Sequence, residues 1–391
     1  GREVGRLGRH PRSEPTRQEP VPGRDLRLAL DMDLMRIVER AFRGHPAGGA
    51  ALVKVRTGRV RALYSKPSYD LNEMSTGPSS TRLQSIEKNP FRPLIDKTVY
   101  ESYFPGSVFK PFVALAALKD GIIDPATRIE CPGFYELGGR RYRCGDAHGE
   151  VDMRKALVVS CNVYFYHLAE MVGLDRMERL AKEFGLGAKS GVGINTEATG
   201  FIPTRDWYEK HYGKYRVGFT LNEALGQGNT RVTMIQLALA YAAIANGGTL
   251  YVPQLVEAVE APEGGAVEVF PPRVRRRVEV DRDYLTFVVD ALFGVVNDVG
   301  GTAFEARLDG GALIAGKTGT AQVAQRRPAP GGNRRAWYYR RSHAWFVGFA
   351  PAPQPELAVA VLVEHGGPGG KYAAPIAVRI LQEALAREGK K

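Results

Sequence analysis

Residues 104–111 read Phe-Pro-Gly-Ser-Val-Phe-Lys-Pro. The serine, Ser107, and the lysine, Lys110, are three positions apart, so both lie on one face of a helix that begins near Pro105. Pro111 is tolerated there because it falls within the first turn, where its missing N–H has no partner to lose. A serine hydroxyl is a weak nucleophile without a base, and a lysine kept neutral by burial or by a second cation is such a base. The stretch therefore predicts a serine nucleophile with a lysine base at a helix N-terminus.

The second motif reads Ser160-Cys161-Asn162 and lies in a segment, 152–172, that otherwise predicts a helix. On a continuous helix Ser160 and Asn162 would point to nearly opposite sides. We therefore expect the chain to bend here, so that both side chains reach one cleft. Ser160 would relay a proton to or from a leaving amine, and Asn162 would bond the backbone of a peptide substrate. The alternative is a serine and an asparagine that only fray a helix.

The third motif reads Lys317-Thr318-Gly319-Thr320 and lies in an apolar stretch that predicts a strand over 314–323. Gly319 has no side chain, so an extended peptide could add to the strand edge. The N–H groups of Thr320 and Ser107 would form a two-donor oxyanion hole. Lys317 is the second cation that lowers the pKa of Lys110, and with the two threonine hydroxyls it suits a terminal carboxylate. The alternative is an ordinary strand with one polar face.

The three cysteines of the chain fall close together, at Cys131, Cys144 and Cys161, with His148 between them. Three thiolates and an imidazole make a tetrahedral zinc site, although the spacing matches no standard zinc finger. Two other interpretations stay open: a disulfide with one odd thiol in an oxidising compartment, or three free buried thiols. If Ser160 and Asn162 face a cleft, Cys161 faces away from it. The zinc hypothesis is therefore a structural ion that braces the motif and takes no part in the reaction.

The composition is that of a globular protein, with 391 residues of which 44% are hydrophobic and 25% charged. The formal net charge of +12 suggests an anionic neighbour. The chain has no phosphate-binding loop, no zinc-finger spacing and no basic helix with interleaved aromatics, so we expect no nucleic-acid partner. Basic residues gather at 275–277 and over 326–341, where a carboxylate substrate or an anionic membrane would meet them.

Residues 1–25 are rich in arginine and proline, which predicts a linker or the remnant of an N-terminal pedestal domain. No apolar run approaches the roughly 18 residues that a membrane span needs. Because the chain starts at Gly1, we interpret it as a soluble fragment from which an anchor has been removed.

From residue 26 onward, periodicity predicts regular structure. Strands are expected at 50–55 and 60–65, joined as a hairpin at Thr57-Gly58, and again at 314–323, 344–349 and 357–364. Helices are expected near 31–42, at 105–120, at 281–296 and at 374–387. Strands at both ends with helices between them predict an α+β fold, in which one antiparallel sheet is built from distant segments.

Taken together, the motifs resemble those of the transpeptidase domain of class B penicillin-binding proteins, of the penicillin-binding protein 2 (cell-elongation) type. The resemblance extends from about Asp25 to the C-terminus. It includes Tyr-Asp-Leu-Asn (69–72), Phe-Pro-Gly-Ser (104–107), Gly-Gln-Gly (226–228), Ile-Ala-Asn-Gly-Gly (244–248) and Ala-Trp-Phe-Val-Gly-Phe-Ala-Pro (344–351). The departures are small and lie away from the chemistry: Leu71 replaces a usual proline, and Lys54 and Arg56 stand where an acidic residue is usual.

This resemblance implies that residues 26–391 have the fold of penicillin-binding proteins and serine β-lactamases, a central antiparallel sheet flanked by helices with a mostly helical subdomain. It implies a peptidoglycan D,D-transpeptidase, in which Ser107 attacks a D-Ala-D-Ala stem peptide and an amine of a neighbouring stem resolves the acyl-enzyme. β-Lactams would acylate the same serine. The intact protein would lie at the periplasmic face of the inner membrane, with a SEDS-type glycosyltransferase and elongation-complex proteins as partners. Some relatives carry a metal site in the matching segment, with aspartate where this chain has cysteine.

Three rival functions share the motifs. A serine β-lactamase must activate water, but the chain has no Glu-x-x-Leu-Asn segment of the class A kind between Ser160 and Lys317. A D,D-carboxypeptidase differs only in its acceptor, which is water in place of an amine. A non-catalytic β-lactam sensor would be acylated without turnover, but such sensors lack the long resemblance described above.

Overall fold

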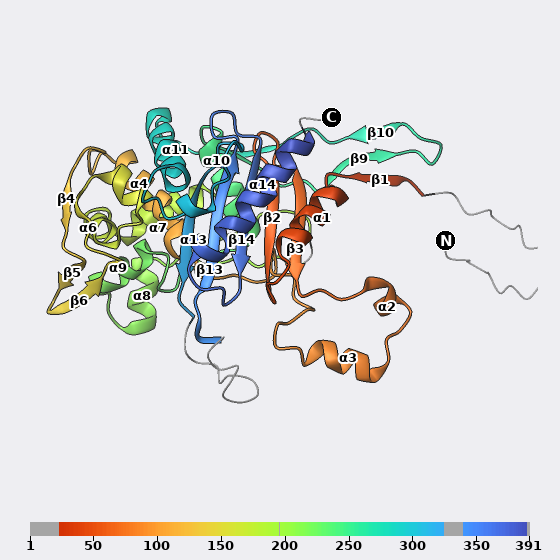
Figure 1. The fold of residues 1–391 in the computed structure, drawn as a ribbon, viewed down its shortest axis with the longest axis horizontal. Helices are drawn as coiled ribbons and strands as arrows, with labels where there is room; N and C mark the ends of the chain where they lie inside the picture. The colour runs from red at the N-terminus through yellow and green to blue at the C-terminus, as the bar shows by residue number, and fades with distance from the viewer. Residues whose placement is uncertain (1–22, 195, 324–338, 389–391) are drawn as a thin grey trace, which may run out of the picture.

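A five-stranded antiparallel sheet forms the centre of the molecule, with strand order β12-β13-β14-β2-β3 (Figure 1). The computed structural model describes residues 23–194, 196–323 and 339–388. The strands of the sheet are β2 (Gly48–Lys54), β3 (Val60–Lys66), β12 (Ala315–Ala321), β13 (His343–Ala350) and β14 (Leu357–Val363). Two strands come from the start of the chain and three from its end, which confirms the predicted antiparallel sheet of distant segments.

The apolar strands β13 and β14 are buried on both faces of the sheet. Side chains alternate between the faces, so Trp345 packs in one core and its neighbour Phe346 in the other. The register places Val347 between Lys317 of β12 and Ala360 of β14. The third motif therefore lies at the edge of the sheet, supported from behind by its most apolar strands.

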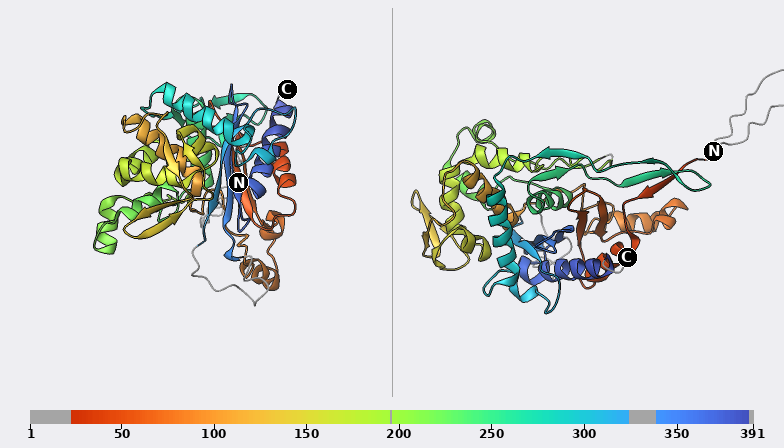
Figure 2. Two further views of the ribbon diagram at one scale, coloured as in Figure 1. Left: turned by 60° about the vertical axis from the view of Figure 1, so that its left-hand side comes forward. Right: turned by 90° about the horizontal axis from the view of Figure 1, so that it is seen from above.

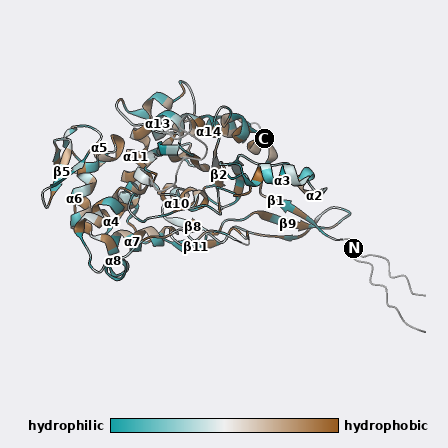
Figure 3. Ribbon diagram, turned by 90° about the horizontal axis from the view of Figure 1, so that it is seen from below, coloured by the Kyte–Doolittle hydropathy of each residue, from teal (hydrophilic) through white to brown (hydrophobic). Residues whose placement is uncertain are grey.

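Helices cover both faces of the sheet, as the edge-on view in Figure 2 shows. One layer consists of α1 (Met32–Ala41), the short helix α13 (Gly369–Tyr372) and α14 (Ala374–Glu388). The other face is covered by α10 (Met234–Ala245) and α11 (Arg282–Asn297). Eleven of the twelve residues of α10 are buried, and Figure 3 shows its hydrophobic colouring against the hydrophilic outlying helix α8 (Arg205–Tyr212).

A mostly helical subdomain packs beyond α10 and α11, as the resemblance implied. Its helices are α4 (Lys110–Lys119), α5 (Met153–Val158), α6 (Asn162–Val172), α7 (Leu174–Glu183), α8 and α9 (Val217–Ala224). Two small antiparallel pairs lie on its surface: β4 (Ile129–Cys131) with β7 (Gly149–Val151), and β5 (Phe134–Leu137) with β6 (Arg140–Arg143).

Several elements were not predicted from the sequence. The strand β1 (Asp25–Leu28) pairs with β9 (Val256–Glu260), which also pairs with β10 (Ala266–Val269), and β8 (Thr249–Tyr251) pairs with β11 (Val274–Arg277). The short helices α2 (Leu71–Ser75) and α3 (Ser80–Glu87) lie outside the main body in Figure 1. These elements bury few side chains, so hydrophobic periodicity gives little signal for them.

Two sequence predictions fall largely outside the described residues. Of the predicted linker 1–25, the structure describes only 23–25, and Asp25 already begins β1. Of the basic segment 326–341, it describes only 339–341. Within the described ranges no helix combines the length and the apolar character that crossing a bilayer requires.

Trp345 ties the sheet to the segment that precedes Ser107. Its side chain is fully buried, its Nε1 donates to Phe104 O at 3.0 Å, and its ring meets that of Tyr103 edge-on. We expect Trp345→Ala to lower the free energy of unfolding by about 3–5 kcal/mol, the usual cost of such a truncation. Urea unfolding measures this, with the half-buried Trp207→Ala as the control that loses less. An equal loss of unfolding free energy in the two variants would contradict the structural role given to Trp345.

Candidate active site

Ser107 lies in a single 3-10 turn, η1 (Gly106–Phe109), which leads directly into α4. The sequence predicted one α-helix over 105–120, and the structure corrects its first turn. Pro111 lies at the start of α4, where it has no N–H to give to a preceding carbonyl. The turn packs on the edge of the sheet so closely that a Cβ on Gly106, whose φ is +60°, would lie 3.1 Å from Thr320 O.

Lys110 joins the first motif to the second. Its side chain is fully buried, and Nζ donates to Ser160 O at 2.8 Å, to Ser160 Oγ at 3.2 Å and to Asn162 Oδ1 at 2.8 Å. In the described part of the chain, Nζ makes no hydrogen bond to Ser107, although the sequence predicted contact between the two side chains. In an enzyme without substrate such a catalytic bond is often long and forms only in the complex.

Burial lowers the pKa of Lys110 to about 8, while the neighbouring sulfurs of Cys161 and Cys144 act in the opposite direction. Burial also lowers the pKa of Lys317 well below its usual value, and the charge of Lys110 lowers it further. Among the described residues neither lysine has a carboxylate partner in a hydrogen bond or salt bridge. The site therefore contains two buried amines, and a neutral amine is the form that accepts a proton.

The predicted bend in the second motif is confirmed. Helix α5 ends at Val158, α6 begins at Asn162, and Ser160 between them has a φ of +58°, which is uncommon for a residue other than glycine. The bend brings both Ser160 and Asn162 to Lys110. Cys161 is fully buried and caps α6, its Sγ accepting from Tyr164 N, so its thiol is enclosed in the body of the subdomain, as expected, while still close enough to Lys110 to act on its pKa.

The third motif presents different residues to the two faces of β12. Gly319 faces the turn that holds Ser107, because a Cβ there would lie 2.9 Å from Pro105 O. On the other face the Thr318 hydroxyl is buried and lies 2.6 Å from Thr302 Oγ1. Thr320 is exposed, and its hydroxyl accepts a bond from Gly369 N at 3.3 Å. That the two threonines bind a substrate carboxylate therefore stays a prediction. To do so, the Thr318 hydroxyl would have to bond the carboxylate as well as Thr302.

Two residues near the motifs were given no role from the sequence. Gln227 bonds the end of β12, donating from Nε2 to Thr320 O at 3.0 Å. Thr302 links the third motif to the second, because its N–H donates to Val158 O at the end of α5. The flanking glycines of Gln227 are a signal in the sequence for close backbone approach, whereas Thr302 carries no comparable signal.

The three cysteines and His148 meet behind the second motif. One ligand atom from each residue lies within 4.8 Å of all the others. His148 Nδ1 is 3.5 Å from both Cys131 Sγ and Cys144 Sγ, and Cys144 Sγ is 4.0 Å from Cys161 Sγ. Sulfur ligands about 2.3 Å from a tetrahedral zinc lie about 3.8 Å apart, so the donor set and its spacing fit that ion. All three cysteines are free thiols here, which does not favour the disulfide interpretation.

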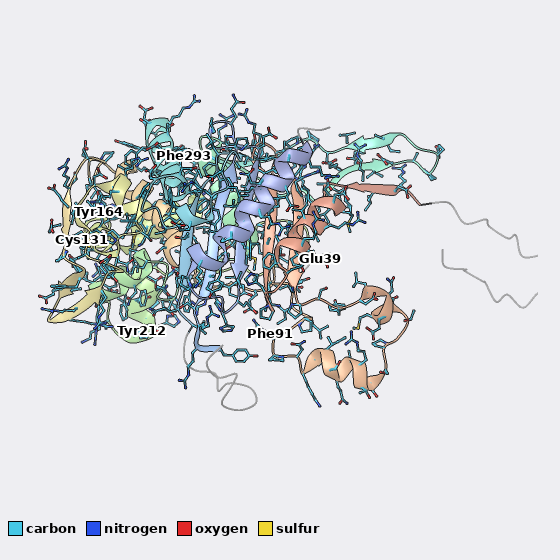
Figure 4. The ribbon with its side chains drawn as sticks, viewed as in Figure 1. Glu39, Phe91, Cys131, Tyr164, Tyr212 and Phe293 are labelled. Carbon is cyan, nitrogen blue, oxygen red and sulfur yellow. The ribbon has the colours of Figure 1, made fainter. Side chains whose placement is uncertain are left out.

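The cluster is bonded to the loop that carries Ser160 and Asn162. Cys144 Sγ accepts a hydrogen bond from Asn162 N at 3.1 Å, and Asn162 Nδ2 donates to Arg143 O at 3.2 Å. Hydrogen bonds from the Cys161 thiol and from the N–H groups of Val163 and Asn162 lower the pKa of Cys144 well below its usual range. Figure 4 labels Cys131 and Tyr164 in this part of the helical subdomain.

Comparison with known proteins identifies the family of the chain. The family described as penicillin binding protein transpeptidase domain matches residues 48–382. The peptidoglycan D,D-transpeptidase MrdA of Acinetobacter baumannii is 36% identical over 363 residues, which are 91% of this chain and 53% of the relative. The chain thus spans about half the length of that curated relative.

Two solved structures share the fold over most of the chain. Penicillin-binding protein 2 of Pseudomonas aeruginosa, in complex with WCK 5153, is 35% identical with a TM-score of 0.81, covering 94% of this chain and 80% of its own. Penicillin-binding protein 2 of Helicobacter pylori, in complex with MreC, is 28% identical with a TM-score of 0.80, covering 94% and 64%. The chain therefore belongs to the family of penicillin-binding protein transpeptidase domains, and its relatives are of the penicillin-binding protein 2 (MrdA) type.

Proposed function

We propose that this chain is the catalytic domain of a peptidoglycan D,D-transpeptidase that acts in cell elongation and maintains cell shape. The observation that carries the proposal is the contact of the buried Lys110 with both Ser160 and Asn162, one helical turn from Ser107. The substrates would be a D-Ala-D-Ala stem peptide as donor and an amine of a neighbouring stem as acceptor. β-Lactams would acylate the same serine.

In the proposed reaction the neutral amine of Lys110 takes the hydroxyl proton of Ser107 as Oγ attacks the penultimate D-Ala carbonyl. The N–H groups of Ser107 and Thr320 stabilise the negative charge on the carbonyl oxygen. Lys110 bonds Ser160 Oγ, so the proton can pass through this hydroxyl to the nitrogen of the leaving D-Ala. The acceptor amine then attacks the ester and returns a proton along the same path, which regenerates Ser107.

A first test is labelling with a fluorescent penicillin, followed by intact mass. We expect one adduct on the wild type and none on Ser107→Ala, because the nucleophile is gone, or on Lys110→Ala, because no base remains. Lys119→Ala on the same helix and the exposed Ser85→Ala are matched controls that should label like the wild type. A labelled Ser107→Ala protein would overturn the assignment of the nucleophile.

The β-lactamase and transpeptidase proposals differ in how fast the acyl-enzyme is hydrolysed. Lys110 and Lys317 bond no carboxylate among the described residues, and a carboxylate is what class A enzymes use to activate water. We expect nitrocefin to give a single burst equal to the protein concentration, with only slow turnover afterwards. Sustained rapid hydrolysis would favour the β-lactamase, and transfer of the acyl group to an added D-amino acid would favour the transpeptidase.

The cellular setting is proposed by similarity. The Helicobacter pylori relative is seen with MreC, and another similar structure, 30% identical with a TM-score of 0.81, belongs to a peptidoglycan synthase complex. We infer that the intact protein is anchored in the inner membrane, lies in the periplasm and works with a SEDS-type glycosyltransferase and elongation-complex proteins.

We also propose that Cys131, Cys144, His148 and Cys161 hold a structural zinc ion. The ion would fix the segment around Cys144 against the loop of the second motif, because Cys144 Sγ accepts from Asn162 N. Zinc would supply no chemistry to the reaction, and this chain's own residues would carry every proton transfer.

Metal analysis of the purified protein tests the site. We expect close to one equivalent of zinc in the wild type and a large loss in His148→Ala and Cys144→Ser, with a lower melting temperature in both. The matched control is His211→Ala, at an exposed histidine that stacks on Trp207, and it should keep its zinc. Metal content near zero in the wild type, with its thiols still reduced, would contradict the proposal.

A further inference from the structure

The loop of residues 225–230 lies between the turn of Ser107 and the free edge of β12. It follows α9 and contains two glycines with positive φ, Gly226 at +63° and Gly228 at +41°. Gly226 O accepts a hydrogen bond from Gly106 N at 2.9 Å. A Cβ on Gly226 would lie 2.3 Å from Gly106 O, so only glycine allows the loop to approach the turn this closely.

The next residue reaches the strand. Gln227 Nε2 donates to Thr320 O at 3.0 Å, and Gln227 Oε1 accepts from Gln322 N at 3.3 Å. The carboxamide thus bonds Thr320 near the end of β12 and Gln322 just beyond it, two alternate residues, as the peptide group of an added strand would. Among the described strands, β12 lies at the edge of the sheet and pairs with β13 alone. The N–H and C=O of one strand residue point to the same side, so the Thr320 N–H also faces this free edge.

A buried carboxylate holds the loop from beneath. Glu223, which is 1% exposed, accepts from Asn229 N at 2.6 Å, from Thr230 N at 3.1 Å and from Thr230 Oγ1 at 2.6 Å. It also accepts from the Tyr208 hydroxyl. Gln227 N donates to Asn222 O at 3.0 Å, so the backbone of Gln227 is itself fixed. The side chain of Gln227 therefore extends from a rigid support.

We infer that Gln227 is a positioning residue, which sets the separation of the two oxyanion-hole donors. One donor, Ser107 N, lies on the turn that Gly226 O holds; the other, Thr320 N, lies on the peptide edge that the Gln227 carboxamide holds. Two adjacent residues of one rigid loop, Gly226 and Gln227, thus bond the two segments that carry the oxyanion-hole donors. The inference rests on the proposed acylation at Ser107. It adds that the loop fixes the turn and the strand relative to each other before substrate arrives.

The test compares Gln227→Met, which keeps the length and loses both hydrogen bonds, with Gln227→Glu, which keeps the acceptor for Gln322 N and loses the donor to Thr320 O. Loss of one oxyanion-hole donor slows enzymes by about 10²–10³, so we expect misplacement of one to slow acylation by penicillin by about tenfold to hundredfold in both variants. The matched control is Gln322→Ala, which keeps the backbone N–H that Gln227 bonds and should acylate like the wild type.

The ester carbonyl of the acyl-enzyme gives a second readout, one that a merely structural role would not change. Its infrared stretch reports hydrogen bonding in the oxyanion hole. We expect it to shift to higher wavenumber in both variants, since weaker donation leaves more double-bond character. Thermal melting identifies a variant that is misfolded. In that case the acylation rate and carbonyl stretch of the other variant test the role of Gln227.

Acylation at the wild-type rate, faster acylation, or slow acylation with an unshifted carbonyl stretch would overturn the inference. Faster acylation would show that the carboxamide blocks the strand edge. If Ser107→Ala is not labelled, each of these results would overturn the role of Gln227 alone and leave the proposed function intact. A labelled Ser107→Ala protein would instead remove the proposed function.

Discussion

The site depends on the burial of two amines that bond no carboxylate among the described residues. Lys110 and Lys317 are both fully enclosed, and the described residues offer them carbonyl, hydroxyl and amide oxygens but no carboxylate. A shift of the Lys110 pKa from 10.5 to about 8 corresponds to roughly 3 kcal/mol of discrimination against the charged form. Burial thus raises the fraction of neutral amine at a given pH by about 10²–10³ over that of a free lysine, although the cation still predominates below pH 8. The bend of the second motif bonds this amine directly, through Ser160 and Asn162, and Ser107 lies three residues before it on the same turn.

Contacts on two sides fix the positions of the three motifs. Behind the second motif, the cysteine cluster bonds the N–H of Asn162 through Cys144 Sγ. In front, the loop of residues 225–230 bonds the turn of Ser107 and the edge of β12. The sheet provides the rigid backing, because β13 and β14 are apolar on both faces and leave β12 little freedom to move.

The sequence predicted many of the parts of this structure that depend on local pattern, although α10, an apolar helix with a capping box, was not among the predicted helices. Apolar runs identified the strands of the sheet, and the two-residue spacing of Ser160 and Asn162 required the bend that the structure contains. It did not predict the short strands β1, β9 and β10, because strands that bury few side chains are stabilised mainly by backbone pairing between remote segments. Nor did it predict that Lys110 would bond Ser160 in place of Ser107, or that Thr318 would be paired with Thr302. Such partners are chosen by tertiary packing, which no local spacing specifies.

The pH dependence of acylation measures the protonation of Lys110 in the working protein. The amine must be neutral to accept the proton of Ser107, so acylation should be slow at low pH, where Lys110 is protonated. We expect a second-order acylation rate constant that rises about tenfold per pH unit and then levels off with an apparent pKa near 8. A rate constant that is flat across that range, or that rises only near the ordinary lysine value of 10.5, would contradict it.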